Sequence, residues 1–333
     1  MNGSPQKPDP KAGVRHLLLG HGLALGCAIV FALNLSLIKV AREDLGALEL
    51  AGARFWIAGL VAMGLWCVRG CPRWRGWDRR AWWWVGMGAV LLGPVFLIML
   101  NTGAVGTSAG LMGVLMATQA LHLAWMGPLF VGEAVGVRQL MALGVSFIGI
   151  ALPLTLGGEV AYSIWWAPLL VGLASGLGAM NVVIPKVLHG RVETVDLATT
   201  ILVIAAIFML PLMGARGEFH QFREMSVTTG LAVLWMGSFG QIGVLVLWYT
   251  AMRRLTAVTA ALYLFVLMLA SSVWGLLLLG EVPHWSEGLA AVVVLVALRI
   301  NAAGGKAARR REAARAAARA NAADGSSRTA EAT

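Results

Sequence analysis

The chain has 333 residues, of which 59% are hydrophobic and only 13% charged, and its formal net charge is +10. A soluble domain of this size carries more charge on its surface, so the composition excludes an ordinary soluble protein. Because the apolar residues come in long runs rather than in the alternation of a barrel strand, we expect an all-α membrane protein.

Runs long enough to cross a hydrocarbon core of ~30 Å as helices recur along the whole sequence. We expect ten transmembrane helices, at 17–38, 47–68, 82–100, 109–130, 138–156, 162–184, 195–213, 229–250, 257–279 and 286–302. A segment at 1–16 precedes them, and a basic, Ala-rich tail at 303–333 follows them. We expect both flanking segments in the cytoplasm, where the tail either lies against anionic lipid or stays solvated.

The positions of the basic residues explain the excess of positive charge. With the N-terminus in the cytoplasm, 21 of the 26 Lys and Arg residues fall on the inner side of the membrane. The positive-inside rule predicts this asymmetry for a multi-pass protein whose two termini are cytoplasmic. We therefore expect a protein of the bacterial inner (cytoplasmic) membrane that contacts membrane lipid, and we expect no nucleic acid partner.

The two halves of the chain share polar residues at a nearly constant spacing of 147 or 148 residues. The matching residues are Asn34 and Asn181, Lys39 and Lys186, Glu49 and Asp196, Gly132-Glu133 and Gly280-Glu281, and Gln139 and Glu287. This pattern indicates an internal duplication, with a first five-helix repeat at 17–156 and a second at 157–302. Because each repeat has an odd number of helices, we expect the two to be inverted, with a binding site between them near the membrane midplane.

Several stretches resemble a known family. They are "LGALELAGARFWIAGLV" at 45–61, "NTGAVGTSAGLMGVL" at 101–115, and the repeated Gly-Glu followed six residues later by Gln or Glu. With these motifs the chain resembles the drug/metabolite transporter superfamily, EamA type, over about 17–302. The resemblance implies export of amino acids, metabolites or toxic compounds from the bacterial cytoplasm, often in exchange for protons. Where the family commonly has a proline in its fourth and ninth helices, this chain has Ala120 and Met268, so we expect straighter helices there.

The function we expect is secondary transport by alternating access, with export of a small organic solute and proton coupling as an open question. An importer or exchanger of the same class is the first alternative. A membrane-embedded enzyme or a sensor without transport is a second, but the sparse charges within the spans argue against catalysis, and we expect no catalytic residues. We also expect no cofactor and no metal, because the three cysteines have no further ligating residues near them. The substrate and the oligomeric state stay open.

Polar side chains within the spans are the candidates for substrate binding, because in hydrocarbon they need a partner or a wet cavity. The fourth and ninth helices each carry such residues on one face, and the amide pair Asn34 and Asn181 repeats between halves. The candidates are Asn34, Asn101, Met116, Gln119, His122, Asn181, Gln241, Trp248, Tyr263 and Trp274. The alternative for the Met and aromatic residues is core packing, for Gln119 a bond to a neighbouring helix, and for His122 a neutral buried imidazole.

Charged residues near the ends of the spans are candidates for gating. Lys39 and Lys186 end the first helix of each repeat, and Glu49 and Asp196 begin the second. Each lysine is therefore expected to pair with the acid across its own short hairpin, at opposite mouths of the pathway; the alternative is a simple anchor in the headgroups. We expect Glu133 and Glu281 to cap the helices that follow them.

Overall fold

The computed structural model describes residues 10–132, 137–156, 162–216, 219–255, 257–293, 295–297 and 299–300. Within these ranges the chain is helical, and the only extended pairing is an isolated bridge between Thr107 and Tyr162. The all-α class is therefore confirmed for the described residues. The expected tail at 303–333 lies outside them, as does Glu133.

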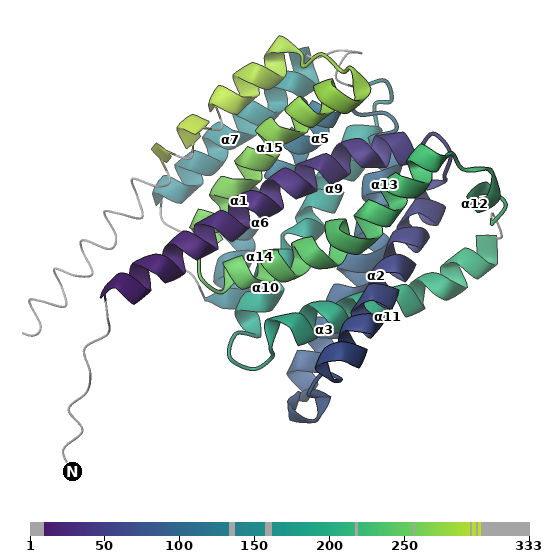
Figure 1. Cartoon of the computed structure of the whole chain (residues 1–333). Coiled ribbons are helices and arrows are strands. Elements are labelled where there is room, and N and C mark those ends of the chain that lie inside the picture. Colours follow the sequence, from purple (N-terminus) through teal and green to yellow (C-terminus); the bar gives the residue numbers. More distant parts are fainter. Residues whose placement is uncertain are drawn as a thin grey trace, which may run out of the picture.

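The helices of the first half follow one another with short connections (Figure 1). They are α1 (Pro10–Ala41), α2 (Ala47–Arg69), η1 (Trp74–Gly76), α3 (Arg79–Val90), η2 (Leu91–Val95), α4 (Phe96–Ala104), α5 (Ala109–Ala117), α6 (Gln119–Met126), η3 (Gly127–Val131) and α7 (Val137–Leu156). Those of the second half are α9 (Ala167–Gly178), α10 (Met180–Val187), α11 (Thr194–Arg216), α12 (Gln221–Glu224), α13 (Val227–Gly237), η4 (Ser238–Gly243), α14 (Val244–Met252) and α15 (Ala257–Leu279), and a last apolar helix covers Trp285–Ala297.

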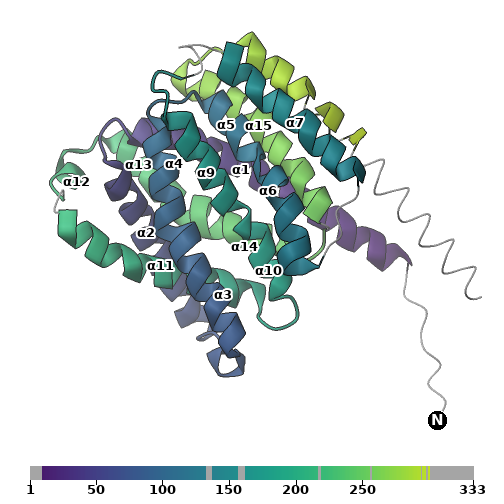
Figure 2. The ribbon, with the colours of Figure 1, turned by 180° about the vertical axis from the view of Figure 1, so that it is seen from behind.

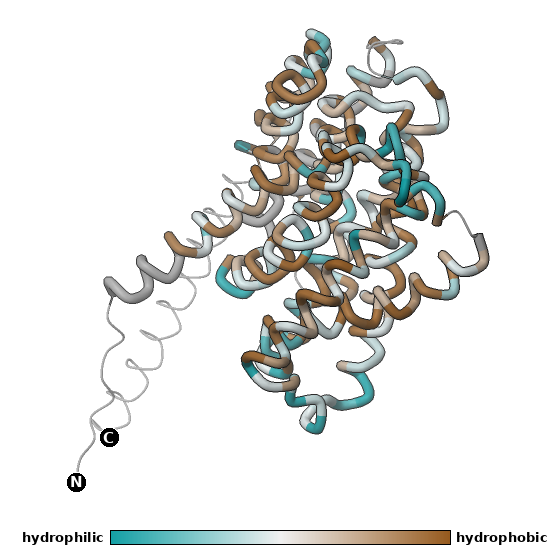
Figure 3. The backbone as a smooth tube through the Cα atoms, turned by 45° about the vertical axis from the view of Figure 1, so that its right-hand side comes forward, coloured by the Kyte–Doolittle hydropathy of each residue, from teal (hydrophilic) through white to brown (hydrophobic). Residues whose placement is uncertain are grey.

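Six helical segments are long and apolar enough to cross a bilayer, and they correspond to six of the ten expected spans. They are Leu18–Ala41, Ala47–Arg69, Arg79–Ala104, Ala167–Val187, Thr194–Ala215 and Val227–Met252. Large apolar side chains such as Leu60 and Ile148 lie exposed on the outside of the bundle. Figure 3 shows hydrophobic residues along the helices and hydrophilic ones mainly at the connecting loops. This distribution is that of a protein whose outer surface faces lipid.

Corresponding helices of the two halves pack in corresponding pairs. α2 packs on its repeat equivalent α11, and α5 on its equivalent α15. The contacts of α1 with α14 and α15 are matched by those of α9 with α4 and α5 (Figures 1 and 2). The core therefore lies largely between the halves, so that neither half completes its packing alone.

The third helix of each half is broken at the same place. η2 interrupts the first at Gly93 and Pro94, where a kink is expected because proline removes a helical hydrogen bond. η4 interrupts the second over Ser238–Gly243, and its first residue lies 147 positions after that of η2, although no proline is present. Both breaks are turns of the π type, which free backbone groups inside the bundle.

The expectation of straighter helices in the absence of proline is wrong for the fourth span. Thr118 separates α5 from α6, and its hydroxyl donates to the carbonyl of Leu115 (2.6 Å). A threonine hydroxyl that bonds back to the preceding turn bends a helix without any proline. The ninth span, α15, runs from Ala257 to Leu279 without interruption.

Gly59 allows a close approach of α2 to α11. A Cβ added at Gly59 would lie 2.9 Å from the Cβ of Ala206, its repeat equivalent. Small residues at such crossings let helices pack tightly in a bilayer. Farther along α2, a Cβ at Gly64 would meet nothing within 4 Å.

We predict that Gly59→Leu destabilises the protein, because the larger side chain forces α2 away from α11 at a cost of about 1–3 kcal/mol. Gly64→Leu makes the same gain in helix propensity without a clash, so its melting temperature should stay close to that of the wild type. Thermal unfolding of both variants in detergent checks this. Equal melting temperatures for the two variants would show that the halves do not meet at Gly59.

Candidate functional site

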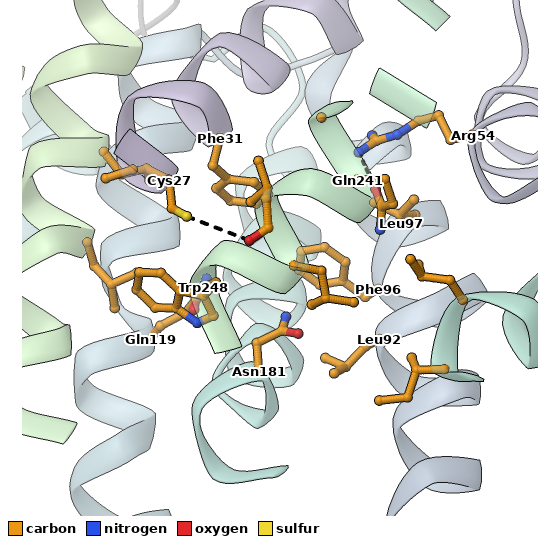
Figure 4. A pocket seen from close by; sticks show the side chains of 18 of the residues that line it. Cys27, Phe31, Arg54, Leu92, Phe96, Leu97, Gln119, Asn181, Gln241 and Trp248 are labelled. Atoms are coloured by element: carbon orange, nitrogen blue, oxygen red, sulfur yellow. Dashed lines mark hydrogen bonds between the residues drawn. The ribbon is translucent and has the colours of Figure 1, made fainter. Parts of the chain in front are cut away.

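A pocket lies in the core where helices of both halves meet (Figure 4). Its volume is about 90 Å³, several times the roughly 10–15 Å³ that one water needs, so there is room for a small solute. The wall is mostly apolar. It is formed by Cys27, Ala28, Phe31, Arg54, Phe55, Leu92, Phe96, Leu97, Gln119, Asn181, Ile201, Leu202, Gly240, Gln241, Val244, Leu245, Trp248, Tyr263, Leu264 and Leu267.

A few polar side chains interrupt this apolar wall. Arg54 and Gln241 lie on one side of the pocket, whereas Gln119 and Trp248 lie on the other (Figure 4). The guanidinium Nη2 of Arg54 donates to Oε1 of Gln241 (2.9 Å). Asn181 accepts a long hydrogen bond from Tyr249 (3.4 Å). An apolar wall with a few convergent polar groups is typical of small-molecule sites.

Five of the ten expected substrate-binding residues thus lie around one pocket: Gln119, Asn181, Gln241, Trp248 and Tyr263. The phenol of Tyr263 also bonds to Nδ1 of His21 (2.6 Å), which connects the pocket to an imidazole on α1. The structure thus brings together side chains from α6, α10, η4, α14 and α15 that are far apart in sequence.

The other five expected residues do not line this pocket. The amide nitrogen of Asn34 donates to the carbonyl of Gly240 (2.8 Å), and that of Asn101 donates to the carbonyl of Ala47 (3.1 Å); both side chains are fully buried. Met116 is also fully buried, Trp274 packs against the core, and the ring of His122 meets the exposed Trp125 edge-on. Asn34 and Asn101 therefore each provide a hydrogen-bond donor to a backbone carbonyl inside the bundle.

The two mirrored asparagines therefore have different surroundings. Asn34 holds the carbonyl of Gly240, which lies in the break between α13 and α14. Asn181 faces the pocket from α10 instead. Residues that are equivalent in the two repeats therefore make different contacts. The breaks themselves differ, because η4 in the second half contains Gln241 where η2 in the first half contains Pro94.

The expected pairing of Lys39 with Glu49 is wrong. Lys39 forms an ion pair with Glu281 and donates to the carbonyl of Thr107 (3.1 Å). Glu49 is buried and lies against Gly46 at the start of its own helix. Its carboxylate acts electrostatically on Arg42, just after α1, rather than on Lys39.

Glu281 also departs from the expected cap. Its other oxygen accepts the backbone N–H of Ala109 at the start of α5 (2.8 Å), and so caps a helix of the first half instead of the helix that follows it. Close by, Ser108 donates to Glu287 (2.9 Å). Lys39, Ser108, Glu281 and Glu287, which we call the end cluster, therefore tie the two halves together.

At the opposite end of α2 the contacts differ. Asp196, which we expected to pair with Lys186, accepts the backbone N–H of Arg73 (3.4 Å). Arg191 pairs with Asp78 (2.9 Å) and Arg69 with Glu193 (3.3 Å). These exposed pairs bind weakly in water, and they join the loop after α10 to the segment after α2.

The comparisons with known proteins agree with this architecture. The EamA-like transporter family matches residues 18–155 and again 164–302, one match for each half. The chain belongs to the EamA-like transporter family. EamA-like proteins are transporters, which fits the multi-pass helical fold and the internal pocket.

Two relatives are transporters by name. A "probable terminal-alkyne amino-acid exporter" of Streptantibioticus cattleyicolor is 27% identical over 193 residues, which cover 56% of this chain and 62%, or less than two thirds, of that relative. An "uncharacterized transporter" of Archaeoglobus fulgidus is 23% identical over 86% of this chain and 97% of its own length. A crystal structure at 17% identity superposes with a TM-score of 0.60 over 90% of this EamA-like chain, and it shows the fold alone.

The sequence reasoning missed Arg54 as a site residue. Arg54 falls within the second expected span, at 47–68. The available signal was that position itself, because an arginine placed well inside an apolar span is costly and marks a functional site.

We predict that Asn34→Leu and Asn181→Leu have opposite signatures. Loss of the Asn34 amide leaves the buried carbonyl of Gly240 without its donor, at a cost of about 1–3 kcal/mol, so the melting temperature falls. Asn181→Leu should keep the melting temperature and alter solute flux, since its amide borders the pocket. Thermal unfolding and flux measured on the same preparations check this. A stable Asn34→Leu variant with impaired flux would instead return Asn34 to the binding site.

Proposed function

We propose that this protein is a secondary transporter of a bacterial inner membrane that exports a small organic solute by alternating access. The observation that carries the proposal is the pocket between the two halves, with amides set into an apolar and aromatic wall. Such a wall suits a partly apolar solute of modest size. The relative named as an amino-acid exporter supports the outward direction.

We infer ten passes in two inverted repeats. The loop between α1 and α2 is joined through Asp44 to Ser226 and Thr229 (2.7 Å and 2.6 Å between side chains). Its repeat equivalent, the loop between α10 and α11, is joined through Arg191 to Asp78, beyond the other end of α2. Equivalent loops at opposite ends of one long helix support inversion. The positive-inside rule then puts the arginine-rich end with Asp78, and both termini, in the cytoplasm.

In this reading the end cluster is a latch on the outer mouth. Lys39 comes from the first half and Glu281 from the second, so this mouth opens only when their ion pair breaks. Inverted repeats exchange conformations during alternating access. The repeat equivalents Lys186 and Glu133, the second of which lies outside the described residues, would latch the inner mouth in the opposite state.

For proton coupling, His21 is better placed than His122. Its ring bonds to Tyr263, which borders the pocket, whereas His122 does not line it. An imidazole can accept and release a proton and so suits proton exchange. The first alternative is import or exchange of the same solute, since the solute and ion gradients decide the direction of transport. The second is a sensor, which would bind the solute without moving it.

Counterflow in proteoliposomes tests the function. Vesicles loaded with one member of a panel of amino acids, amines and drug-like compounds are given the labelled compound outside, with and without a pH gradient. We expect uptake that depends on the loaded solute and that Gln119→Ala reduces several-fold. Absence of counterflow for every compound, with a folded protein that still binds one of them, would favour the sensor.

The latch predicts a specific change in accessibility. With Cys67 and Cys71 replaced by serine, Cys27 on the pocket wall remains as the reporter thiol. Glu281→Gln removes the charge that holds Lys39, so a membrane-impermeant thiol reagent added outside whole cells should modify Cys27 several-fold faster. Glu43→Gln, at an exposed carboxylate of the same end, is the control and should leave the rate unchanged. The same rate in both variants would argue against the latch.

A further inference from the structure

We propose that Arg54 binds the carboxylate of the transported solute, and that the substrates are small monocarboxylates with an apolar body, such as apolar α-amino acids. The inference rests on the carrier function proposed above. It adds the chemical class of the solute and the residue that selects it.

Arg54 is buried well inside the bundle. It lies seven residues after Ala47, the start of α2, which is about 10 Å along the helix at 1.5 Å per residue. Its side chain is 1% exposed and is the largest of the fully buried ones. Because an arginine keeps its proton in proteins, a positive charge lies in the interior of a bundle that is surrounded by lipid.

This charge has no partner of opposite sign among the described residues. The one hydrogen bond of its guanidinium goes to the neutral amide of Gln241, and Nε and Nη1 have no partner within the described chain. The ion pairs formed there involve other residues. Glu49, on the same helix, lies against Gly46 and is not paired with Arg54. A buried charge without a counter-charge is strongly unfavourable, which points to an anion that arrives from outside the chain.

The unpaired guanidinium lies at the pocket. Arg54 and Gln241 both line it, side by side (Figure 4). A carboxylate that takes the place of the Gln241 oxygen meets a planar guanidinium fork, which binds carboxylates through two parallel N–H···O bonds. The amide of Gln241 is then free to donate its own N–H to the same group.

The rest of the pocket defines the other parts of the solute. Phe31, Phe96 and Trp248 offer apolar and aromatic surface for a hydrocarbon side chain. Gln119 and Asn181, away from Arg54, supply amide oxygens for an amine (Figure 4). The pocket volume of about 90 Å³ limits the solute to a small molecule. Recognition of a carboxylate at one side and an apolar body beyond it is the arrangement expected for an apolar amino acid.

Arg54, on α2, is connected through Gln241 to the break in the second half. Gln241, its hydrogen-bond partner, belongs to η4, whose carbonyl at Gly240 is held by Asn34. An anion that displaces Gln241 therefore acts directly on the broken segment between α13 and α14. Binding of the solute and movement of that segment are thus linked through one side chain.

The test compares leucine with leucine methyl ester, which keeps the amine and the hydrocarbon but lacks the carboxylate. Binding and counterflow are measured on the full chain for the wild type, Arg54→Gln, Arg54→Lys and the exposed-arginine control Arg223→Gln. We expect the wild type and Arg223→Gln to prefer leucine. Arg54→Gln should lose leucine affinity about tenfold or more, as for a hydrogen bond to a charged group, and Arg54→Lys should retain part of it.

A stability measurement separates binding from a structural role. If Arg54 is unpaired until a solute anion binds, Arg54→Met should leave the melting temperature of the ligand-free protein unchanged or raise it, because an uncompensated buried charge has been removed. Leucine should then raise the melting temperature of the wild type but not of Arg54→Met. A large fall in the ligand-free melting temperature of both Arg54→Met and Arg54→Lys would overturn the proposal in favour of a structural arginine.

The outcomes also separate this inference from the carrier function. Counterflow of amines or drug-like compounds, with no preference of the wild type for leucine over its ester, would overturn the anion site and leave the carrier intact. Wild-type preference in Arg54→Gln would do the same. No counterflow and no binding of any compound would instead overturn the carrier function, and the anion site with it.

Discussion

Inside a bilayer a backbone or side-chain polar group without a partner in the protein is costly, because hydrocarbon offers none. The breaks in η2 and η4 are therefore demanding, since a π-type turn frees carbonyls in the middle of the bundle. The amide of Asn34 satisfies one of these groups from a helix that is 206 residues away in the sequence. A broken helix is tolerated in a membrane where it is buried in protein or borders a cavity, and both breaks here border the pocket.

The same constraint distinguishes the two halves. Their frameworks match, with equivalent helices packed in equivalent pairs and equivalent breaks. The residues at the breaks do not match, because Pro94 carries no donor or side-chain amide and Gln241 carries an amide that meets Arg54. The helices are arranged symmetrically, but the residues that line the pocket are not, so that only the side with Arg54 and Gln241 carries a charge. Such an asymmetry suits a solute with distinct polar and apolar ends.

The helical class and the duplicated organisation could be predicted from the sequence because they depend on local apolar runs and on fixed spacing. The pairing of Lys39 could not, since its partner Glu281 is brought close only by packing between the halves, and spacing pointed to the nearer Glu49. Asn34 and Asn181 looked equivalent for the same reason. Spacing places both at matching depth, but only the fold decides that one meets a carbonyl and the other a cavity.

In the proposed carrier, the two strongest electrostatic features act on different parts of one cycle. The ion pair of Lys39 with Glu281 is satisfied, and it holds α1 to the segment after α15 at one mouth. The charge of Arg54 is not satisfied, and it lies beside the break of the neighbouring helix. A solute shifts the populations of a carrier's conformations only if it binds one conformation more tightly than the other. An unpaired buried cation supplies that difference in affinity, and a solute that neutralises it shifts the equilibrium toward the conformation in which the guanidinium and the carboxylate fit together.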